Sequence, residues 1–273
     1  MTNRVNINLG TVQKTLFLPL WGRAAETRKP KPMLVDETAA RIIDQIDYDF
    51  SQITQNLDEL SRIAWIKRSQ VCDRIVKNFL SSYPEGTIVN LGCGLDTTFE
   101  RIDNGKLRWY DLDLADVIEL RKKFIKENER RKFIASSFLE RDWLENIAVT
   151  GNVLFIAAGL FYYFEERRIK EFIIRLIDRY TGSEMLFDVS SPMGVKIANK
   201  KVIESSGLDE RSYLTWGLKN KKDMLAWDPR IKIVGTHYYF RTLRIGLRNV
   251  MMGTLSDLLG IQYMVHLRLG SIE

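Results

Sequence analysis

The feature that most constrains the fold is a short apolar run that ends in a pair of glycines. Residues 87–91 (TIVNL) have the length and character of a buried strand, and Gly92-Cys93-Gly94 follows at once. Glycines at the end of a strand let the backbone turn sharply and approach a ligand closely, because no Cβ intervenes. Thr97 and Glu100 then have the spacing of a capping box, which predicts a helix start. The run therefore predicts a strand, a turn that could cradle a ligand, and a helix.

A second strand-like run, residues 107–111, lies about twenty residues further on and leads into two acids, Asp111 and Asp113. A carboxylate at this spacing typically binds the hydroxyls of a ribose. A nicotinamide fingerprint would have a third glycine at position 97, where this chain has Thr97, so a ligand without phosphates fits better. The alternative is that the glycines only shape a turn and the acids only cap the next helix.

The remainder of the chain alternates between strand-like and helical patterns. Further strands are expected at 132–135, 152–157, 185–189, 231–240 and 262–268, and helices at 36–46, 60–80, 114–129 and 165–180. The helix over 165–180 has the clearest amphipathic pattern. This alternation predicts an α/β fold with an open, doubly wound parallel sheet and helices on both faces. The last two strands could close the sheet as a hairpin-like edge, and residues 190–228 are expected to form an insertion over the strand ends.

Composition fits one globular domain over residues 1–273. Apolar residues make up 45% and charged residues 28% of the chain, which excludes a disordered or fibrous protein, and no repeat or long linker divides it. The longest apolar stretch, 153–164, falls short of the ~20 residues that cross a bilayer. We therefore expect a cytoplasmic protein without a membrane partner, because the amino terminus also lacks the pattern of a secretory signal.

Charge and cysteine usage narrow the function classes further. The net charge is +6, but basic clusters such as Arg121-Lys122-Lys123 alternate with acids, which favours solvated helix faces over a nucleic-acid groove. Two histidines and two cysteines offer no spacing typical of a metal site. Cys72 and Cys93 are expected to be free thiols.

Arg68 stands out because it lies on the apolar side of a helix. In the pattern over 60–80, Ala64 and Cys72 lie one turn away from it on the stripe expected to face the core. A buried guanidinium needs an anion, either a protein carboxylate or the carboxylate of a ligand. The alternative is that the side chain extends past the helix end to solvent.

Several segments together resemble the leucine carboxyl methyltransferase family. They are Lys14-Thr15 with WGRA at 21–24, DETA at 36–39, VNLGCGLDTTFER at 89–101, WYDLD at 109–113 and FIAAGLFYYF at 155–164. The resemblance covers nearly the whole chain and is strongest to the bacterial branch of tetracenomycin-type polyketide O-methyltransferases. It implies a class I methyltransferase with a Rossmann-like, seven-stranded, mostly parallel sheet. It also implies an amino-terminal helical extension over 1–80 and a late substrate lid over 190–228.

The resemblance implies S-adenosylmethionine as cofactor and a set of residues that bind it. Those residues are Lys14, Arg68, Gly92, Cys93, Gly94, Leu112, Asp113, Ser137, Phe138, Ala157 and Ala158. Gly92 and Gly94 fall on the cofactor loop, Asp113 on the ribose acid, and Arg68 on the arginine that meets the methionine carboxylate. Lys14 is a second partner for that carboxylate. Ser137 and Phe138 flank the adenine.

The chain also departs from the family pattern. Ala158 stands where human-type carboxyl methyltransferases have a glutamate, and Ser137 where relatives often have an aspartate. The first departure argues against the substrate of the phosphatase-modifying enzymes. Both motivate an alternative, a cofactor-binding sensor or scaffold without turnover.

The acceptor is expected to be a small molecule, methylated on a hydroxyl or a carboxylate. The residues expected to contact it are Phe17, Trp21, Tyr163, Tyr213 and Trp216. Aromatic walls suit a flat or apolar acceptor, such as a polyketide, although each ring could instead dock the lid onto the core. Methyl transfer is an in-line displacement that depends mainly on positioning, so no catalytic residue is assigned. Less favoured alternatives are a protein carboxyl methyltransferase and a nicotinamide-dependent oxidoreductase.

Overall fold

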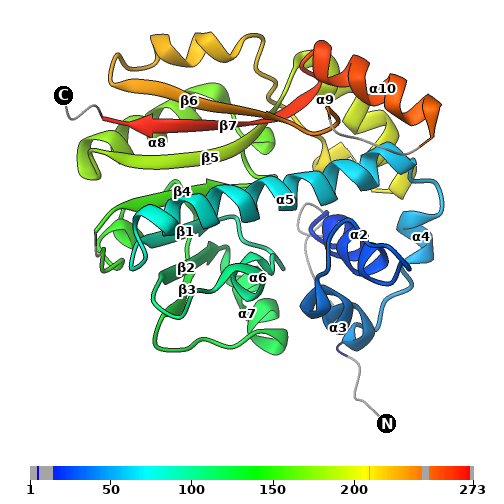
Figure 1. Ribbon diagram of the computed structural model, residues 1–273, viewed down its shortest axis with the longest axis horizontal. Helices are drawn as coiled ribbons and strands as arrows, with labels where there is room; N and C mark the ends of the chain where they lie inside the picture. The colour runs from blue at the N-terminus through cyan, green and yellow to red at the C-terminus, as the bar shows by residue number, and fades with distance from the viewer. Residues whose placement is uncertain (1–4, 6–14, 150, 209, 242–245, 271–273) are drawn as a thin grey trace.

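The computed structural model describes residues 5, 15–149, 151–208, 210–241 and 246–270, and within them seven strands form one sheet (Figure 1). The strands are β1 (Thr87–Leu91), β2 (Arg108–Asp113), β3 (Arg131–Ala135), β4 (Val153–Ala157), β5 (Ser183–Ser190), β6 (Ile231–Tyr238) and β7 (Gln262–Leu269). Their order is β3-β2-β1-β4-β5-β7-β6. The pairs among β1 to β5 are parallel, and β7 runs antiparallel to both neighbours. The predicted doubly wound α/β fold is confirmed.

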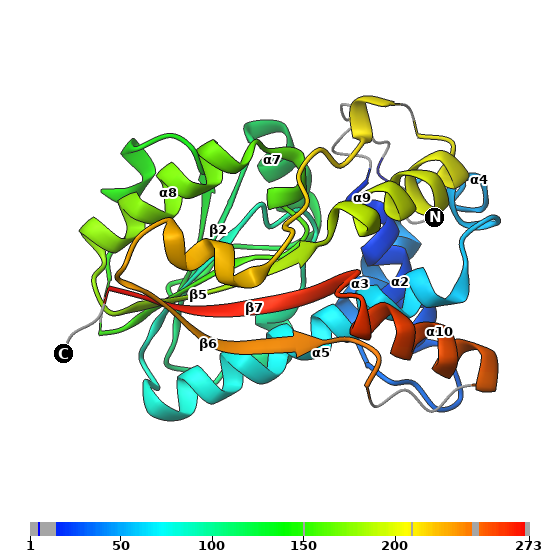
Figure 2. The same cartoon turned by 90° about the horizontal axis from the view of Figure 1, so that it is seen from above.

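The helices lie on both faces of this sheet and beyond the carboxyl ends of its parallel strands. They are α2 (Phe17–Thr27), α3 (Glu37–Gln45), α4 (Ser51–Thr54), α5 (Glu59–Ser82), α6 (Thr98–Ile102), α7 (Ala115–Phe124), α8 (Glu166–Arg179), α9 (Pro192–Ala198) and α10 (Leu247–Leu258). Short helical turns are η1 (Asp142–Leu144), η2 (Phe161–Tyr163), η3 (Asn199–Ile203), η4 (Glu204–Ser206), η5 (Glu210–Ser212) and η6 (Lys221–Ala226). Figure 2 shows α8 and α5 on opposite sides of the strands.

Two apolar cores follow from the alternation of side chains along the strands. On one face, α8 packs Ile169, Ile173 and neighbouring residues against β1, β4, β5 and β7. On the other face, α5 packs residues such as Val76 and Phe79 against Ile88 and other residues of the same strands. The amphipathic helix predicted over 165–180 is therefore confirmed, with bounds that differ by one residue at each end.

The amino-terminal helices form a third apolar cluster. α2 and α3 bury Leu20, Ala24 and Ile42 against one another and against Leu120 and Phe124 of α7. Figure 1 shows α2 and α3 beyond the carboxyl ends of the parallel strands. These helices consequently cover the end of the sheet where doubly wound folds bind their ligands.

Several local predictions were wrong. The helix over 114–129 ends at Phe124, where Ile125 adopts an extended backbone conformation, and the Asn128 side chain then accepts the amides of Arg130 and Arg131 in a turn. The predicted capping box does not form: the hydroxyl of Thr97 donates to Asp36 at 2.5 Å, and Asp96 accepts the amide of Thr98 instead.

The two carboxyl-terminal strands close the sheet as an antiparallel pair at its edge, as predicted. Their connection is longer than a hairpin turn, because α10 lies between them in the sequence. β7 is the inner strand of the pair. It inserts between β5 and β6 and pairs with all of β5, from Ser183 opposite Leu269 to Ser190 opposite Gln262.

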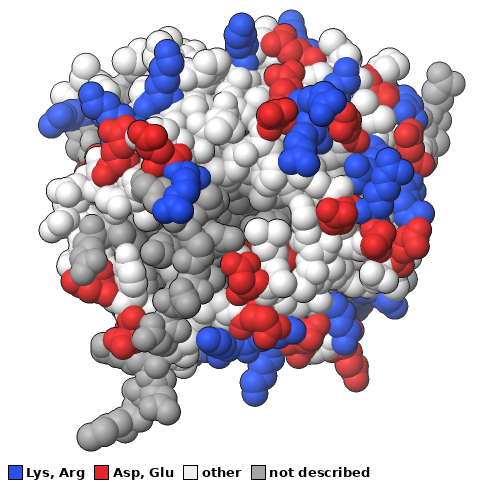
Figure 3. All heavy atoms as spheres, turned by 180° about the vertical axis from the view of Figure 1, so that it is seen from behind, with Lys and Arg blue, Asp and Glu red and all other residues white. Residues whose placement is uncertain are grey.

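The surface carries charges of both signs. On the face in Figure 3, basic and acidic side chains lie near one another, mainly toward the rim of the view. Among the described ranges, no helix is both long enough and apolar enough to span a bilayer.

Candidate functional site

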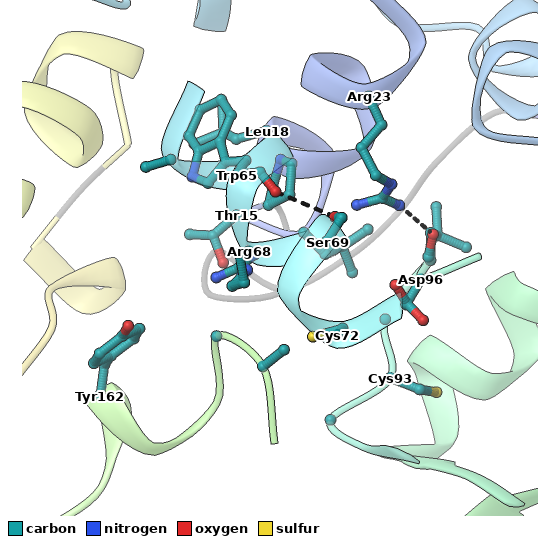
Figure 4. Close-up of a pocket in the computed structure, with 18 of the residues that line it drawn as sticks. Thr15, Leu18, Arg23, Trp65, Arg68, Ser69, Cys72, Cys93, Asp96 and Tyr162 are labelled. Carbon is teal, nitrogen blue, oxygen red and sulfur yellow. Dashed lines mark hydrogen bonds between the residues drawn. The ribbon is translucent and has the colours of Figure 1, made fainter. Parts of the chain in front are cut away.

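A cavity of about 200 Å³ lies at the carboxyl ends of β1 and β4 (Figure 4). Its lining comes from the turns that follow these two strands, from α2 and α5, and from the segment between β5 and β6. Of the residues predicted to bind the cofactor, Arg68, Gly92, Cys93, Gly94 and Ala158 line it. The structure thus brings residues from three distant parts of the chain to one cavity.

The glycine turn after β1 has the backbone shape that its sequence requires. Gly92 and Gly94 have φ angles of +61° and +47°, a region that L side chains rarely adopt. A Cβ on Gly92 would stand 2.6 Å from Cδ1 of Leu160, and one on Gly94 would stand 3.4 Å from Cβ of Leu16. The contact with Leu160 therefore requires glycine at position 92, and glycine at position 94 leaves room beside Leu16, which lines the cavity. Burial raises the pKa of the Cys93 thiol, so the cysteine between them remains protonated.

Two arginines hold three successive carbonyls of this turn. Arg121 donates to the carbonyls of Gly94 and Asp96, each at 2.8 Å, and Arg23 donates to that of Leu95 at 3.1 Å. Arg121 was expected on a solvated face, but it is fully buried. The signal that could have found it is its spacing from Val117 and Phe124, because four and three residues along a helix place all three on one face.

The two acids near the end of β2 have different surroundings. Asp111 is fully buried and accepts hydrogen bonds from Asn90, Trp109, Arg121 and Arg131 at 2.7–3.2 Å. Its role is therefore to neutralise buried arginines.

Asp113 is partly exposed and accepts the amides of Gly94 at 2.7 Å and Leu114 at 2.8 Å. Burial raises the pKa of its carboxyl group above the ordinary value, against the lowering effect of these amides. Each carboxylate oxygen keeps a lone pair, so Asp113 can still accept two hydroxyls. Neither Asp113 nor Leu112 lines the cavity, but the bond to Gly94 places Asp113 directly beside the glycine turn.

Arg68 has a protein carboxylate as partner. Its Nη1 donates to Oδ2 of Asp188 at 3.0 Å, and its side chain is 13% exposed. Burial lowers the pKa of Arg68, but the charge of Asp188, the nearby Tyr239 and Tyr162 and the hydrogen bond to Asp188 together outweigh burial and raise the pKa above the ordinary value. The side chain therefore does not extend to solvent past the helix end.

The predicted adenine-side residues lie outside the cavity lining. Phe138 is buried among Phe161, Phe164 and Phe172, and the hydroxyl of Ser137 accepts the amide of Leu139 at 3.3 Å. Ala157 is buried within β4, next to Ala158. Lys14 lies outside the described residues.

Of the five residues predicted to contact the acceptor, Tyr163 lines the cavity, and its hydroxyl donates to Thr15 at 3.2 Å. The other four lie elsewhere. Phe17 is buried among the rings of Tyr48 and Phe50, and Trp21 packs against the same cluster. Tyr213 donates its hydroxyl to Glu204, and Trp216 is a core residue that donates to Glu166.

The structure places at the cavity two polar residues to which the sequence assigned no role. Gln262, at the start of β7, donates to the hydroxyl of Tyr162 at 3.1 Å, and both side chains line the cavity. The carbonyl of Tyr162 accepts the amides of Thr215 and Trp216, which fastens the segment between β5 and β6 to this wall. Burial raises the pKa of Tyr162 well above 10, so its hydroxyl acts as a hydrogen-bonding group.

The described ranges contain neither a candidate metal site nor a disulfide. They contain no group of three or more His, Cys, Asp and Glu side chains that could hold a metal ion. Cys72 and Cys93 are both buried free thiols, as expected.

Comparisons with known proteins give a consistent picture. A family model described as leucine carboxyl methyltransferase matches residues 17–177. The chain is 29% identical over 228 residues to the tetracenomycin polyketide synthesis O-methyltransferase TcmP of Streptomyces glaucescens, covering 83% of this chain and 82% of that protein. It is 26% identical over 248 residues to the S-adenosyl-L-methionine-dependent methyltransferase dpfgK of Gibberella zeae, with the same coverage of each chain. A candidate methyltransferase from Thermobifida fusca shares the fold, with a TM-score of 0.61 at 13% identity over 95% of both chains.

Proposed function

We propose that this chain, which belongs to the leucine carboxyl methyltransferase family and is an S-adenosylmethionine-dependent methyltransferase, methylates an oxygen atom of a small molecule. The observation that carries the proposal is the 29% identity to TcmP over 83% of the chain, because that relative is a polyketide O-methyltransferase. The proposed acceptor is accordingly a polyketide-like or other aromatic compound with a hydroxyl or a carboxylate.

The residues of the cavity suit the cofactor. The glycine turn offers backbone without side chains, Asp113 beside it has lone pairs for ribose hydroxyls, and Arg68 offers a cation for a carboxylate. In this proposal Lys14 assists Arg68, and Cys93 and Ala158 form walls of the site. Leu112 and Ala157, which do not line the cavity, are assigned to the cofactor site on the strength of the family resemblance alone. Ser137 and Phe138 are proposed beside the adenine on the strength of the family resemblance.

The bound cofactor supplies a methyl group on a sulfonium, which an acceptor oxygen takes by in-line displacement. The chain contributes position and exclusion of water. Tyr162 and Gln262 offer hydrogen bonds to a polar group of the acceptor, and Tyr163 offers an aromatic wall. We propose that residues 190–228 act as the lid, because the amides of Thr215 and Trp216 hold this segment to the carbonyl of Tyr162.

The proposal is tested by calorimetry with S-adenosylmethionine, followed by turnover assays on aromatic polyketide phenols, aromatic carboxylic acids and a peptide that ends in leucine. We expect cofactor binding and transfer to at least one aromatic acceptor, detected by mass spectrometry and abolished by omitting the cofactor. Methylation of the peptide alone would point to a protein carboxyl methyltransferase. Binding without turnover on any acceptor would support a sensor or scaffold. This alternative is suggested by the departures from the family pattern at Ala158 and Ser137.

A further inference from the structure

One buried carboxylate ties the predicted cofactor arginine to the turn that follows β4. Asp188 lies on β5 and is fully buried. Its Oδ2 accepts Nη1 of Arg68 at 3.0 Å, and its Oδ1 accepts the backbone amide of Gly159 at 2.6 Å. Both oxygens are therefore engaged, one by a side chain of α5 and the other by the turn that forms the opposite wall of the cavity.

The space around Arg68 restricts it on the same side. Gly159 has a φ angle of +78°, and a Cβ added there would stand 2.9 Å from Nη1 of Arg68. The guanidinium thus lies directly against the backbone of the turn, and Figure 4 shows Arg68 between α5 and this turn. A long, flexible side chain is held at its tip by one ionic hydrogen bond and by contact with glycine.

This arrangement leaves the other nitrogens of Arg68 available. Within the described residues, its hydrogen bonds use Nη1 alone, and the side chain lines the cavity. A guanidinium binds a carboxylate best through two parallel N–H groups in one plane. Fixing Nη1 fixes the orientation of that plane, and hence the direction in which Nε and Nη2 point.

We propose that Asp188 is a positioning residue, which orients Arg68 so that its free N–H groups meet the methionine carboxylate of the cofactor. The inference rests on the role proposed above for Arg68. Asp188 also neutralises the arginine, so its charge and its positioning act in opposite directions on a second carboxylate. Removing the charge would strengthen binding, whereas losing the orientation would weaken it.

Asp188→Asn removes the charge and the orientation together, so the sign of the change in affinity shows which effect dominates. The orientation is lost because an amide has one accepting oxygen where the native site needs two. Either Gly159 or Arg68 would then face the NH₂ group, which is a donor, and the arginine would be pushed out of position. We expect the Kd for S-adenosylmethionine to rise roughly 10-fold or more, as for the loss of a charge-assisted hydrogen bond. The Kd for methylthioadenosine, which lacks the carboxylate, should change less than about 2-fold.

The experiment is calorimetry with both ligands on the full chain. It uses the native protein, Asp188→Asn, Arg68→Lys and the double variant, which forms a mutant cycle. In the Arg68→Lys background, Asp188→Asn should add little, because the planar contact is already lost. Asp257→Asn is the matched control, since Asp257 is another buried aspartate that accepts a backbone amide, that of Phe240, away from the cavity. It should not alter the preference for S-adenosylmethionine over methylthioadenosine.

Equal losses for the two ligands would overturn the proposal and make Asp188 purely structural. Tighter binding of S-adenosylmethionine would overturn it as well, because the charge effect would then dominate. A native protein that binds neither ligand would contradict the proposed function itself, whereas an unchanged preference in Arg68→Lys would remove only the role of Arg68 and, with it, that of Asp188. If Asp188→Asn does not fold, Asp188→Glu keeps the charge and both accepting oxygens but moves them by one methylene, and it should cause the same selective loss.

Discussion

At the scale of single residues, the two acids near the end of β2 differ in what they hold. Asp111 balances two buried arginines, whereas Asp113 holds the glycine turn and keeps lone pairs toward the proposed ribose position. Removing one partner of a buried ion pair leaves an uncompensated charge in the core. The two positions should therefore respond in different assays.

We expect Asp111→Asn to lower the free energy of unfolding by about 3–5 kcal/mol. Asp113→Asn should instead weaken S-adenosylmethionine binding about 10- to 100-fold, because two hydroxyls lose a charged acceptor. Urea denaturation measures the first effect and calorimetry the second. The assignment fails if Asp113→Asn is the variant that mainly loses stability, or if a stable Asp111→Asn protein loses more cofactor affinity.

Both acids could be located from the sequence, but their different roles could not be predicted from it. Spacing along the chain placed both acids near the end of a strand, and the family resemblance selected Asp113. The partners that bury Asp111 come from β1, α7 and β3, so their convergence depends on the register of the sheet. For Arg68, the apolar stripe correctly predicted a buried cation that needs an anion, but Asp188 lies 120 residues away on β5. Tertiary contacts of this kind leave no local pattern.

At the scale of elements, the glycine turn after β1 lies so close to Leu160 that Gly92 has no room for a side chain. Gly92→Ala should destabilise the chain and weaken S-adenosylmethionine binding, because a methyl group there collides with Leu160 and strains a positive φ angle. Gly105→Ala is the matched control, since Gly105 has a φ of +78° with nothing within 4 Å of the added Cβ. Thermal denaturation and calorimetry on both variants isolate the collision. Equal effects would mean that backbone strain alone matters at Gly92.

The elements themselves were predicted best where the periodicity was long. α8 and α5 have stripes of several turns that match the faces they bury, and their bounds differ from the prediction by one or two residues. α7 was predicted too long because apolar spacing gives no boundary in the charged stretch that follows Phe124. The four aromatic residues that line no part of the cavity were expected there because rings at a cavity wall and rings in a core have the same sequence pattern.

At the scale of the whole molecule, β6 and α5 meet through a histidine. Nδ1 of His237 lies 3.3 Å from Nη2 of Arg74, and burial, followed by the charges of Arg74 and His266, lowers the pKa of His237 to about 4. The unfolded chain binds this proton near pH 6.5. Acidification from pH 6.5 to 4 therefore favours the unfolded state. The stability of the folded state is free of this loss only above about pH 6.5, where His237 is neutral in both states.

We expect His237→Gln to show a smaller loss of stability between pH 7 and pH 5 than the native chain. A glutamine amide oxygen can still accept from Arg74, but it does not titrate. Urea midpoints at the two pH values measure the difference, which should be modest because the histidine is only partly buried. Parallel pH dependences for the two proteins would contradict the prediction.

The insertion of β7 between β5 and β6 also has a consequence for synthesis on the ribosome. β6 has β7 as its neighbour in the sheet, and β7 is made after it, with α10 in between. The nascent chain therefore carries β6 as an unpaired strand, and β5 as an open edge, until residues 262–269 have emerged. Unpaired edges of this kind can pair with other chains, so we expect the growing polypeptide to be exposed to aggregation during this interval.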